Sequence, residues 1–149
     1  MEKIEKELMI LVGPIGVGKT TFGKSLENDT SIRISQDEQG KKRHFQLFKD
    51  ALNDNVPRII VDRMGFNREQ RLRYINLARE QNYVVTIFEF KAPREVCIKN
   101  AMSRQNHPTV KPDLDLINNI LDFFEQNYEA VDSFEYDNYN VVELDVSSQ

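Results

Sequence analysis

The stretch Gly13-Pro14-Ile15-Gly16-Val17-Gly18-Lys19-Thr20 matches the pattern G-x-x-x-x-G-K-S/T at every fixed position. A short apolar run at residues 8–12 precedes it, as expected of a buried strand, and residues 20–27 continue as a predicted helix. Glycine lets the backbone N–H groups of such a loop point inward around an anion, and the following helix adds the positive end of its dipole. The stretch therefore predicts a phosphate-binding P-loop that holds a nucleoside triphosphate.

The residues of this loop have separate expected roles toward the triphosphate and its magnesium ion. Lys19 should reach the β- and γ-phosphates, the Thr20 hydroxyl should bind Mg²⁺, and Thr21 should contact the α-phosphate. A glycine-rich turn with a chance lysine is the alternative, but chance would produce the full pattern roughly once in a few hundred chains of this length. The nucleotide-binding set is completed by the backbone of Gly13, Pro14, Ile15, Gly16, Val17 and Gly18.

Strand and helix patterns alternate along the rest of the chain. Strands are predicted at residues 8–12, 31–35, 58–61, 83–90 and 139–144. Helices are predicted at residues 20–27, 39–52, 67–81, 93–104 and 113–127, and the proline-containing segment between the last two suits a lid. This alternation predicts an α/β fold of the P-loop NTPase class. We expect one domain over residues 1–149, with a parallel sheet of about five strands, helices on both faces and a helical lid.

Composition narrows the class of protein and of partner. With 40% hydrophobic and 30% charged residues, the chain is typical of a soluble globular protein, and no apolar run is long enough to span a membrane. A single cysteine and a charged N-terminus without a signal peptide favour a cytoplasmic location. Ten acids and no Lys or Arg follow Lys111, so residues 1–111 carry +6 within a chain of net charge −4. A nucleic-acid partner would therefore contact the first two-thirds of the chain.

Two aspartates follow predicted strands, at the edge of the sheet where the P-loop also lies. A kinase needs a carboxylate that accepts or orients the proton of the acceptor hydroxyl. Asp37 is assigned to that role, because it follows the strand at residues 31–35. Asp62 ends the strand at residues 58–61 and is expected to hold Mg²⁺ through water or to bond to Thr20. The alternative for each is an ordinary turn or capping aspartate.

Cationic residues follow the same strand ends. A guanidinium at Arg104, at the start of the predicted lid, could stabilise charge on the transferring phosphoryl group. Single cations of this kind are usually surface charges, but several groups near strand ends favour a binding role. His44 is expected at the surface, whereas Phe45, Phe48, Phe123, Phe124, Tyr128 and Phe134 are expected to pack in the core. The residues expected to bind the substrate are Lys41, Lys42, Arg43, Arg63, Arg71 and His107.

Taken in order, these motifs resemble those of the polynucleotide 5′-kinases, which include the kinase domains of phage end-healing enzymes and fungal tRNA ligases. The resemblance covers nearly the whole chain, from about residue 8 to residue 144. It implies transfer of the γ-phosphate of ATP or GTP, with Mg²⁺, to the 5′-hydroxyl end of RNA or DNA. The matching motifs are Gly13–Thr20, Ile34-Ser35-Gln36-Asp37-Glu38-Gln39-Gly40, Val61-Asp62-Arg63 with Asn67 and Arg71, and Arg104-Gln105-Asn106-His107-Pro108.

The resemblance also implies roles and partners. Lys19 corresponds to the family's P-loop lysine, Asp37 to its hydroxyl-side aspartate and Arg104 to its lid arginine, and these three are the expected catalytic residues. Phage-type members carry an arginine three residues after the aspartate, where this chain has Gly40, so the tRNA-ligase type is closer here. A separate ligase or phosphatase is an expected partner in nucleic-acid repair, and a phage could encode the chain.

Two other functions remain open from the sequence. A small-molecule kinase of the gluconate or shikimate type would share the fold and the P-loop but would need a small, closed acceptor pocket. A non-catalytic NTP-binding switch would use the nucleotide to control a partner interaction, with the acidic C-terminal segment as its interface.

Overall fold

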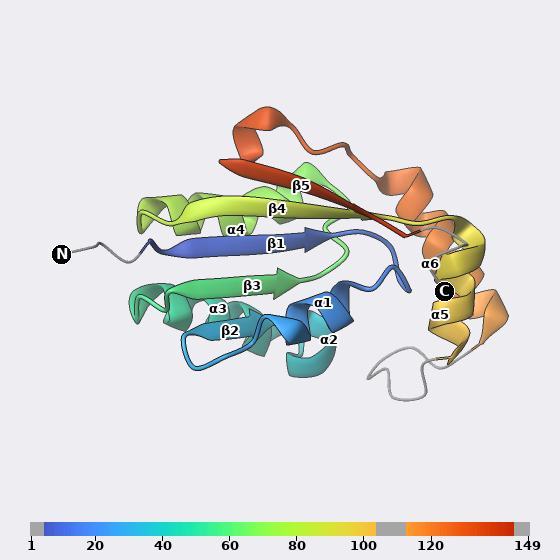
Figure 1. The fold of residues 1–149 in the computed structure, drawn as a ribbon, viewed down its shortest axis with the longest axis horizontal. Coiled ribbons are helices and arrows are strands. Elements are labelled where there is room, and N and C mark those ends of the chain that lie inside the picture. The colour runs from blue at the N-terminus through green and yellow to red at the C-terminus, as the bar shows by residue number, and fades with distance from the viewer. Residues whose placement is uncertain (1–4, 104–112, 145–149) are drawn as a thin grey trace.

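A computed structural model describes residues 5–103 and 113–144 of the chain. Its described part contains one five-stranded sheet with helices packed around it (Figure 1). The strands are β1 (Glu7–Val12), β2 (Ser31–Ile34), β3 (Arg58–Asp62), β4 (Val84–Lys91) and β5 (Asn138–Glu143). The helices are α1 (Lys19–Ser25), α2 (Gln36–Gln39), α3 (Lys41–Asn53), α4 (Arg68–Glu80), α5 (Arg94–Ser103), α6 (Leu114–Asn127) and the short 3-10 helix η1 (Ser133–Glu135).

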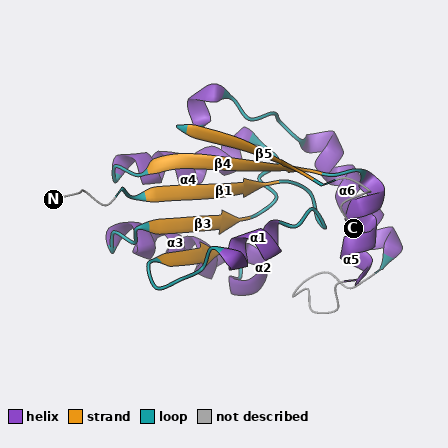
Figure 2. Cartoon of the chain, in the orientation of Figure 1, coloured by secondary structure: helices purple, strands orange, loops and turns teal. Residues whose placement is uncertain are grey.

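The sheet has the strand order β2-β3-β1-β4-β5, and every neighbouring pair is parallel. The strand arrows therefore all point the same way, and the loops after β1 and β3 lie at one edge of the sheet (Figure 2). In the register of the central strands, Leu11 lies opposite Asp62 and Val12 lies opposite Glu89. The predicted parallel sheet of about five strands is confirmed.

The central strand has apolar side chains on both faces because helices cover both sides of the sheet. Leu8 and Ile10 contribute to a core that includes residues of α3 and α4. Met9 and Leu11, which point the opposite way, belong to a second core to which α1, α5 and α6 contribute. A strand buried on both faces needs a continuous apolar run, which is what residues 8–12 provide. The prediction of helices on both faces is confirmed.

One predicted helix is divided in the structure. The sequence predicts a helix over residues 39–52, but α2 ends at Gln39 and α3 begins at Lys41. Gly40 separates them with φ 87° and ψ 157°, a conformation that strains residues with a side chain. The break leaves Asp37 on its own short helix at the end of β2.

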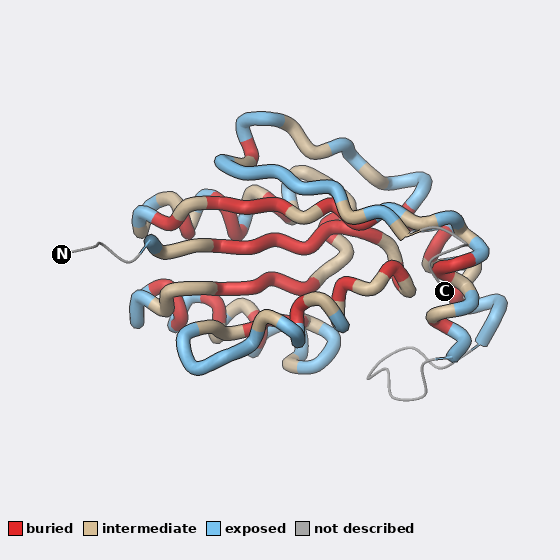
Figure 3. The backbone as a smooth tube through the Cα atoms, in the orientation of Figure 1, coloured by how far each residue is buried: buried red, intermediate tan, exposed pale blue. Residues whose placement is uncertain are grey.

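Strand β5 is the exception to the buried character of the sheet. Figure 3 shows β1, β3 and β4 mostly buried, whereas β5 is mostly exposed. Tyr139 and Val141 are among its exposed residues. Phe123 and Phe134 are also exposed, at 47% and 56%, so their predicted place in the core was wrong. Phe124 is buried and Tyr128 is partly buried, as predicted.

A buried ion pair connects α4 to the segment after α6. Arg71 donates to the carboxylate of Glu135 at 2.6 Å, and both side chains are fully buried. The same guanidinium donates to the backbone carbonyls of Gly65 at 2.6 Å and Glu129 at 2.9 Å. Buried charges need such partners because their hydration is lost. This pair therefore attaches residues 129–135 to the body of the fold.

His44 lies in the core rather than at the surface, and its predicted surface position was wrong. Its side chain is 1% exposed. Nδ1 lies 3.1 Å from the carbonyl of Gly40, and Nε2 lies 2.8 Å from the hydroxyl of Tyr74. A neutral ring with its proton on Nδ1 satisfies both contacts, because the tyrosine hydroxyl can then donate to Nε2. Burial first, and the positive charge of Arg63 second, lower the pKa of His44 below its ordinary value of 6.5.

The lowered pKa of His44 predicts a dependence of stability on pH. Below about pH 6.5 the unfolded chain binds a proton at His44 that the folded chain resists, so the free energy of unfolding should fall as the pH falls. One such group contributes a slope of up to about 1.4 kcal/mol per pH unit. When the free energy of unfolding is measured by urea unfolding at several pH values between 7.5 and 5.5, it should change less with pH for His44→Gln than for wild type. The His107→Gln variant retains His44 and should keep the slope, and equal slopes for wild type and His44→Gln would contradict the prediction.

Candidate phosphotransfer site

The predicted P-loop follows β1 and leads directly into α1. Gly16 and Gly18 have φ values of 79° and 97°, which glycine adopts without strain. A Cβ atom at Gly16 would lie 2.1 Å from the carbonyl oxygen of Cys97 on α5. The loop therefore packs so closely against α5 that only glycine fits at this position. Tight packing fixes the path of the loop, as a preformed phosphate cradle requires.

Lys19 begins α1 and turns its side chain back over the loop. Its Nζ atom donates to the carbonyl of Pro14 at 3.0 Å, and the residue as a whole is 9% exposed. The ammonium group is thus held beside the first residues of the loop. A phosphate group bound within the loop would meet this charge together with the backbone N–H groups at the start of α1.

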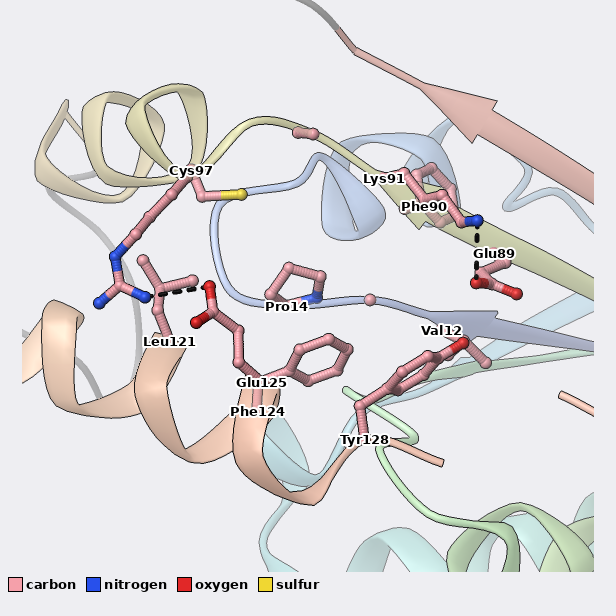
Figure 4. Close-up of a pocket in the computed structure, with 13 residues that line it drawn as sticks. Val12, Pro14, Glu89, Phe90, Lys91, Cys97, Leu121, Phe124, Glu125 and Tyr128 are labelled. Atoms are coloured by element: carbon pink, nitrogen blue, oxygen red, sulfur yellow. Dashed lines mark hydrogen bonds and ion pairs between the residues drawn. The ribbon is translucent and has the colours of Figure 1, made fainter. Parts of the chain in front are cut away.

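A cleft of about 990 Å³ brings the P-loop and the predicted acceptor residues together. Lys19, Thr20 and Thr21 line it from the loop and α1, and Asp37 and Asp62 line it from the ends of β2 and β3. Most of the expected nucleotide-binding residues therefore meet both carboxylates in one cavity, where the parallel strands end, whereas Gly13 and Pro14 line a separate, smaller cavity (Figure 4). The lining also includes Ile15, Gly16, Val17, Gly18, Arg63, Asn100, Ser103 and Leu144.

Asp62 and Thr20 are the residues that could hold magnesium. Asp62 is 8% exposed, at the end of the strand next to β1, and both residues line the cleft. Mg²⁺ prefers oxygen ligands and is commonly held by one or two side chains, water and the phosphates of the nucleotide. Among residues 5–103 and 113–144, no group of three or more His, Cys, Asp or Glu side chains could enclose a metal by itself. The hydroxyl of Thr20 and the carboxylate of Asp62 are oxygen donors of the kind that magnesium prefers.

Arg33 is a site residue that the sequence analysis missed. It is 9% exposed on β2, and its guanidinium donates to Asp62 at 3.0 Å and to Glu27 at 2.7 Å. It also pairs with Glu38, which lies next to Asp37 on α2. One buried cation thus connects Asp62 to the short helix that carries Asp37. The sequence feature that could have indicated its role is a charged residue between two isoleucines of a predicted strand, Ser31-Ile32-Arg33-Ile34.

The predicted substrate-binding cations fall into different environments. Lys41, Lys42 and Arg43 are exposed in the first turn of α3, just after the helix that bears Asp37. Arg63 lines the cleft, and its guanidinium donates to the hydroxyl of Tyr74 at 2.8 Å. Of these four cations only Arg63 lines the cleft, whereas Lys41, Lys42 and Arg43 follow the short helix whose Asp37 lines it.

Arg71 does not belong to the site, and its predicted substrate-binding role is corrected by the structure. Its guanidinium is fully buried and already occupied by Glu135 and by backbone carbonyls. The sequence could have indicated this burial, because helical spacing places Arg71 on the same face of α4 as Ile75 and Ala78, and that face is buried. Arg104, His107 and the predicted lid lie outside the described residues.

A family model described as "AAA domain" matches residues 38–127, which is more than half of the chain. The match begins after the P-loop, so the loop motif and the family model support the same class independently. No curated protein matches the sequence significantly. Within the described residues no helix is both long enough and apolar enough to cross a membrane.

Several solved structures have the same fold. A candidate kinase from Chloroflexus aurantiacus J-10-fl superposes with a TM-score of 0.72 at 16% identity, over 97% of this chain and 91% of that one. Kti12 from Chaetomium thermophilum, solved with ADP-AlF3, has a TM-score of 0.62 at 12% identity, with coverages of 91% and 88%. A sugar kinase from Janibacter sp. HTCC2649 has a TM-score of 0.59 at 16% identity, with coverages of 97% and 87%. At these identities the likeness concerns the fold.

Proposed function

The chain belongs to the AAA domain family, a family of P-loop kinases, and on this premise we propose that it is a polynucleotide 5′-hydroxyl kinase. In the proposed reaction the 5′-hydroxyl oxygen of an RNA or DNA end attacks the γ-phosphorus of ATP or GTP. The bond to the β,γ-bridging oxygen breaks, and the nucleoside diphosphate leaves. The observation that carries the proposal is the group of exposed cations at the start of α3, directly after the short helix whose Asp37 lines the cleft together with Lys19.

These cations are poorly placed for helix stability. Lys41, Lys42 and Arg43 occupy the first turn of α3, which contains no acid. The amino end of a helix carries partial positive charge, so cations there oppose the dipole, by about 0.3–1 kcal/mol each. Local conflicts of this kind concentrate at functional sites. A polyanionic chain that lies across this end of α3 would turn the unfavourable charges into favourable contacts.

The remaining residues divide the chemistry between donor and acceptor. Asp37 accepts the proton of the attacking hydroxyl or orients it, and Lys19 neutralises charge on the transferring phosphoryl group. Thr20 and Asp62 would hold a magnesium ion, which would neutralise charge on the phosphates. Arg33 keeps Asp62 in place and ties it, through Glu38, to the helix of Asp37. Arg63 contributes a further cation on the acceptor side.

An end-labelling assay tests the proposal. The protein is incubated with γ-labelled ATP or GTP, Mg²⁺ and 5′-hydroxyl oligonucleotides of RNA and DNA, with 5′-phosphorylated oligonucleotides as matched controls. Label should enter only the 5′-hydroxyl ends. The fold shared with a sugar kinase makes a small-molecule acceptor the competing function, so gluconate and shikimate are assayed in parallel. Label on a small molecule alone, or hydrolysis without any acceptor, would replace the proposal with the small-molecule kinase or the NTP-dependent switch.

Asp37 provides the sharpest test of the acceptor side. The Asp37→Asn variant should bind NTP nearly normally but transfer phosphate about 10²- to 10⁴-fold more slowly, because it loses a general base while keeping its shape. Single-turnover transfer and NTP binding are measured separately. Asp29→Asn is the matched control, because Asp29 is exposed just before β2, at the amino-terminal ends of the strands, whereas Asp37 lies at their carboxyl ends. Full transfer by Asp37→Asn would refute the assigned role.

A further inference from the structure

Arg63 is held at the cleft by a buried tyrosine. It directly follows the last residue of β3, is half-buried and lines the cleft. Its Nη1 atom donates to the hydroxyl of Tyr74 at 2.8 Å. A guanidinium has several N–H donors, and in the described part of the chain Tyr74 is its only hydrogen-bond partner and no carboxylate pairs with it. The remaining donors and the positive charge are therefore available to a ligand in the cleft.

Tyr74 is bonded in turn to a histidine on the neighbouring helix. The hydroxyl of Tyr74, on α4, lies 2.8 Å from Nε2 of His44 on α3, and Nδ1 of that ring lies 3.1 Å from the carbonyl of Gly40. Both side chains are buried. Gly40 separates α3 from α2, the short helix that carries Asp37. The buried chain from Arg63 through Tyr74 and His44 to Gly40 therefore joins the end of β3 to the end of α2.

The direction of each hydrogen bond in this buried chain is fixed from its two ends. Arginine can only donate, so the hydroxyl oxygen of Tyr74 accepts from Arg63. The carbonyl of Gly40 can only accept, so Nδ1 of His44 carries the proton and Nε2 has a lone pair. The proton of the Tyr74 hydroxyl is thus donated to Nε2. Each polar group of the chain is satisfied, and removal of the hydroxyl would deprive Arg63 and His44 of a partner at the same time.

Aromatic packing fixes the position of the hydroxyl in the middle of the chain. The ring of Tyr74 makes edge-on contacts with Phe48, at 5.0 Å between ring centroids, and with Phe45, at 5.8 Å. Both phenylalanines lie on α3, as does His44. An unrestrained arginine side chain has many rotamers, and ordering them opposes binding. A partner that is itself locked by packing can hold Arg63 in one orientation before a ligand arrives.

We infer that Tyr74 and His44 are positioning residues of the proposed kinase, which hold Arg63 in the orientation that binds the acceptor. The inference rests on the proposed function, because the role of Arg63 toward the acceptor is part of it. The alternative is that Tyr74 and His44 only stabilise the packing of α3 against α4. That alternative accounts for the bond between these two residues, but it does not require the further bond to a cation at the cleft. It predicts a loss of stability without a change in acceptor binding.

The experiment measures kcat and the KM for a 5′-hydroxyl oligonucleotide at saturating NTP. Tyr74→Phe keeps the ring but removes the hydroxyl, and it should raise the acceptor KM about tenfold while kcat stays within about threefold of wild type. Arg63→Met should raise this KM at least as much, and adding Tyr74→Phe to it should have no further effect, because Tyr74 acts through Arg63. Tyr83→Phe is the matched control and should leave the KM unchanged, because the buried hydroxyl of Tyr83 donates to the carbonyl of Val56, near the amino end of β3.

Two variants of His44 keep the inference testable if Tyr74→Phe does not fold in urea unfolding experiments. His44→Gln offers an amide oxygen that can accept from the Tyr74 hydroxyl, so it should keep the acceptor KM close to that of wild type. His44→Leu fills similar space without an acceptor and should raise the KM, as Tyr74→Phe does. Equal acceptor KM values for the two folded variants would remove His44 from the positioning role.

The outcomes separate this inference from the proposed function. If wild type labels oligonucleotides but folded Tyr74→Phe has an unchanged acceptor KM, the positioning role is wrong although the kinase activity stands. The same conclusion follows if Tyr74→Phe raises the KM by the same factor with and without Arg63, because the hydroxyl then acts independently of the guanidinium. If wild type labels no oligonucleotide, the proposed function fails and the positioning role fails with it.

Discussion

Replacement of Lys19 by methionine is expected to lower the rate of phosphate transfer about 10²- to 10³-fold while the protein remains folded. Nζ of Lys19 is held 3.0 Å from the carbonyl of Pro14, next to the expected position of the γ-phosphate. Methionine preserves the apolar stem of the side chain but removes the charge that would stabilise the transferring group. Backbone N–H groups of the loop remain, so nucleotide binding should weaken less than transfer.

Single-turnover transfer and thermal unfolding are measured on the same preparation of Lys19→Met. Lys49→Met is the matched control, because Lys49 is an exposed residue of α3 that does not line the cleft. Its transfer rate should stay within a factor of two of wild type. A Lys19→Met rate within tenfold of wild type, in a folded protein, would show that the loop does not hold the transferred phosphate.

The largest expected effect on stability comes from the buried pair of Arg71 and Glu135. Removing one partner of a buried ion pair costs about 3–5 kcal/mol, because the other charge is left without compensation. Arg71→Met also leaves the carbonyls of Gly65 and Glu129 without their donor. Domains of this size have unfolding free energies of about 5–15 kcal/mol, so the variant should be close to the limit of folding.

Urea unfolding measures the loss for Arg71→Met and for Glu135→Gln. The same helix supplies a matched control in Arg68→Met, because Arg68 pairs with Asp132 while both side chains are more than 40% exposed. Exposed pairs contribute about 0–1 kcal/mol, so this variant should be nearly as stable as wild type. A loss below about 1 kcal/mol for Arg71→Met would contradict a structural role and would reopen its assignment to substrate binding.

The connections of Arg33 join the two halves of the candidate site. Asp62 is placed by β3 and Asp37 by α2, and these elements are separated in the sequence by all of α3. Arg33 contacts Asp62 and Glu38, so the position of α2, which carries Asp37, depends on the same cation as the position of Asp62. Buried charged networks of this kind rigidify a site when all members are paired.

The sequence by itself determined the features that depend on local patterns. The P-loop was identifiable because its glycines, lysine and threonine have fixed spacing between an apolar strand and a helix. The strands were recognisable from short apolar runs, and their alternation with helices implied a parallel sheet. Asp37 and Asp62 could be placed near the loop because parallel strands all end at one edge. The cleft that they share follows from this topology.

Only the tertiary structure decided features that depend on contacts between distant segments. Arg71 and Asp62 are both charged residues near strand or helix ends, yet one pairs with Glu135 in the core and the other meets Arg33 at the cleft. The exposure of Phe123 and the burial of His44 likewise depended on neighbouring residues that are distant in the sequence and cannot be identified from a local pattern. The small cavity beside the P-loop also required the packing of α5 and α6. Spacing along the chain specifies elements and their ends, whereas burial and pairing are set by whichever segments the fold brings together.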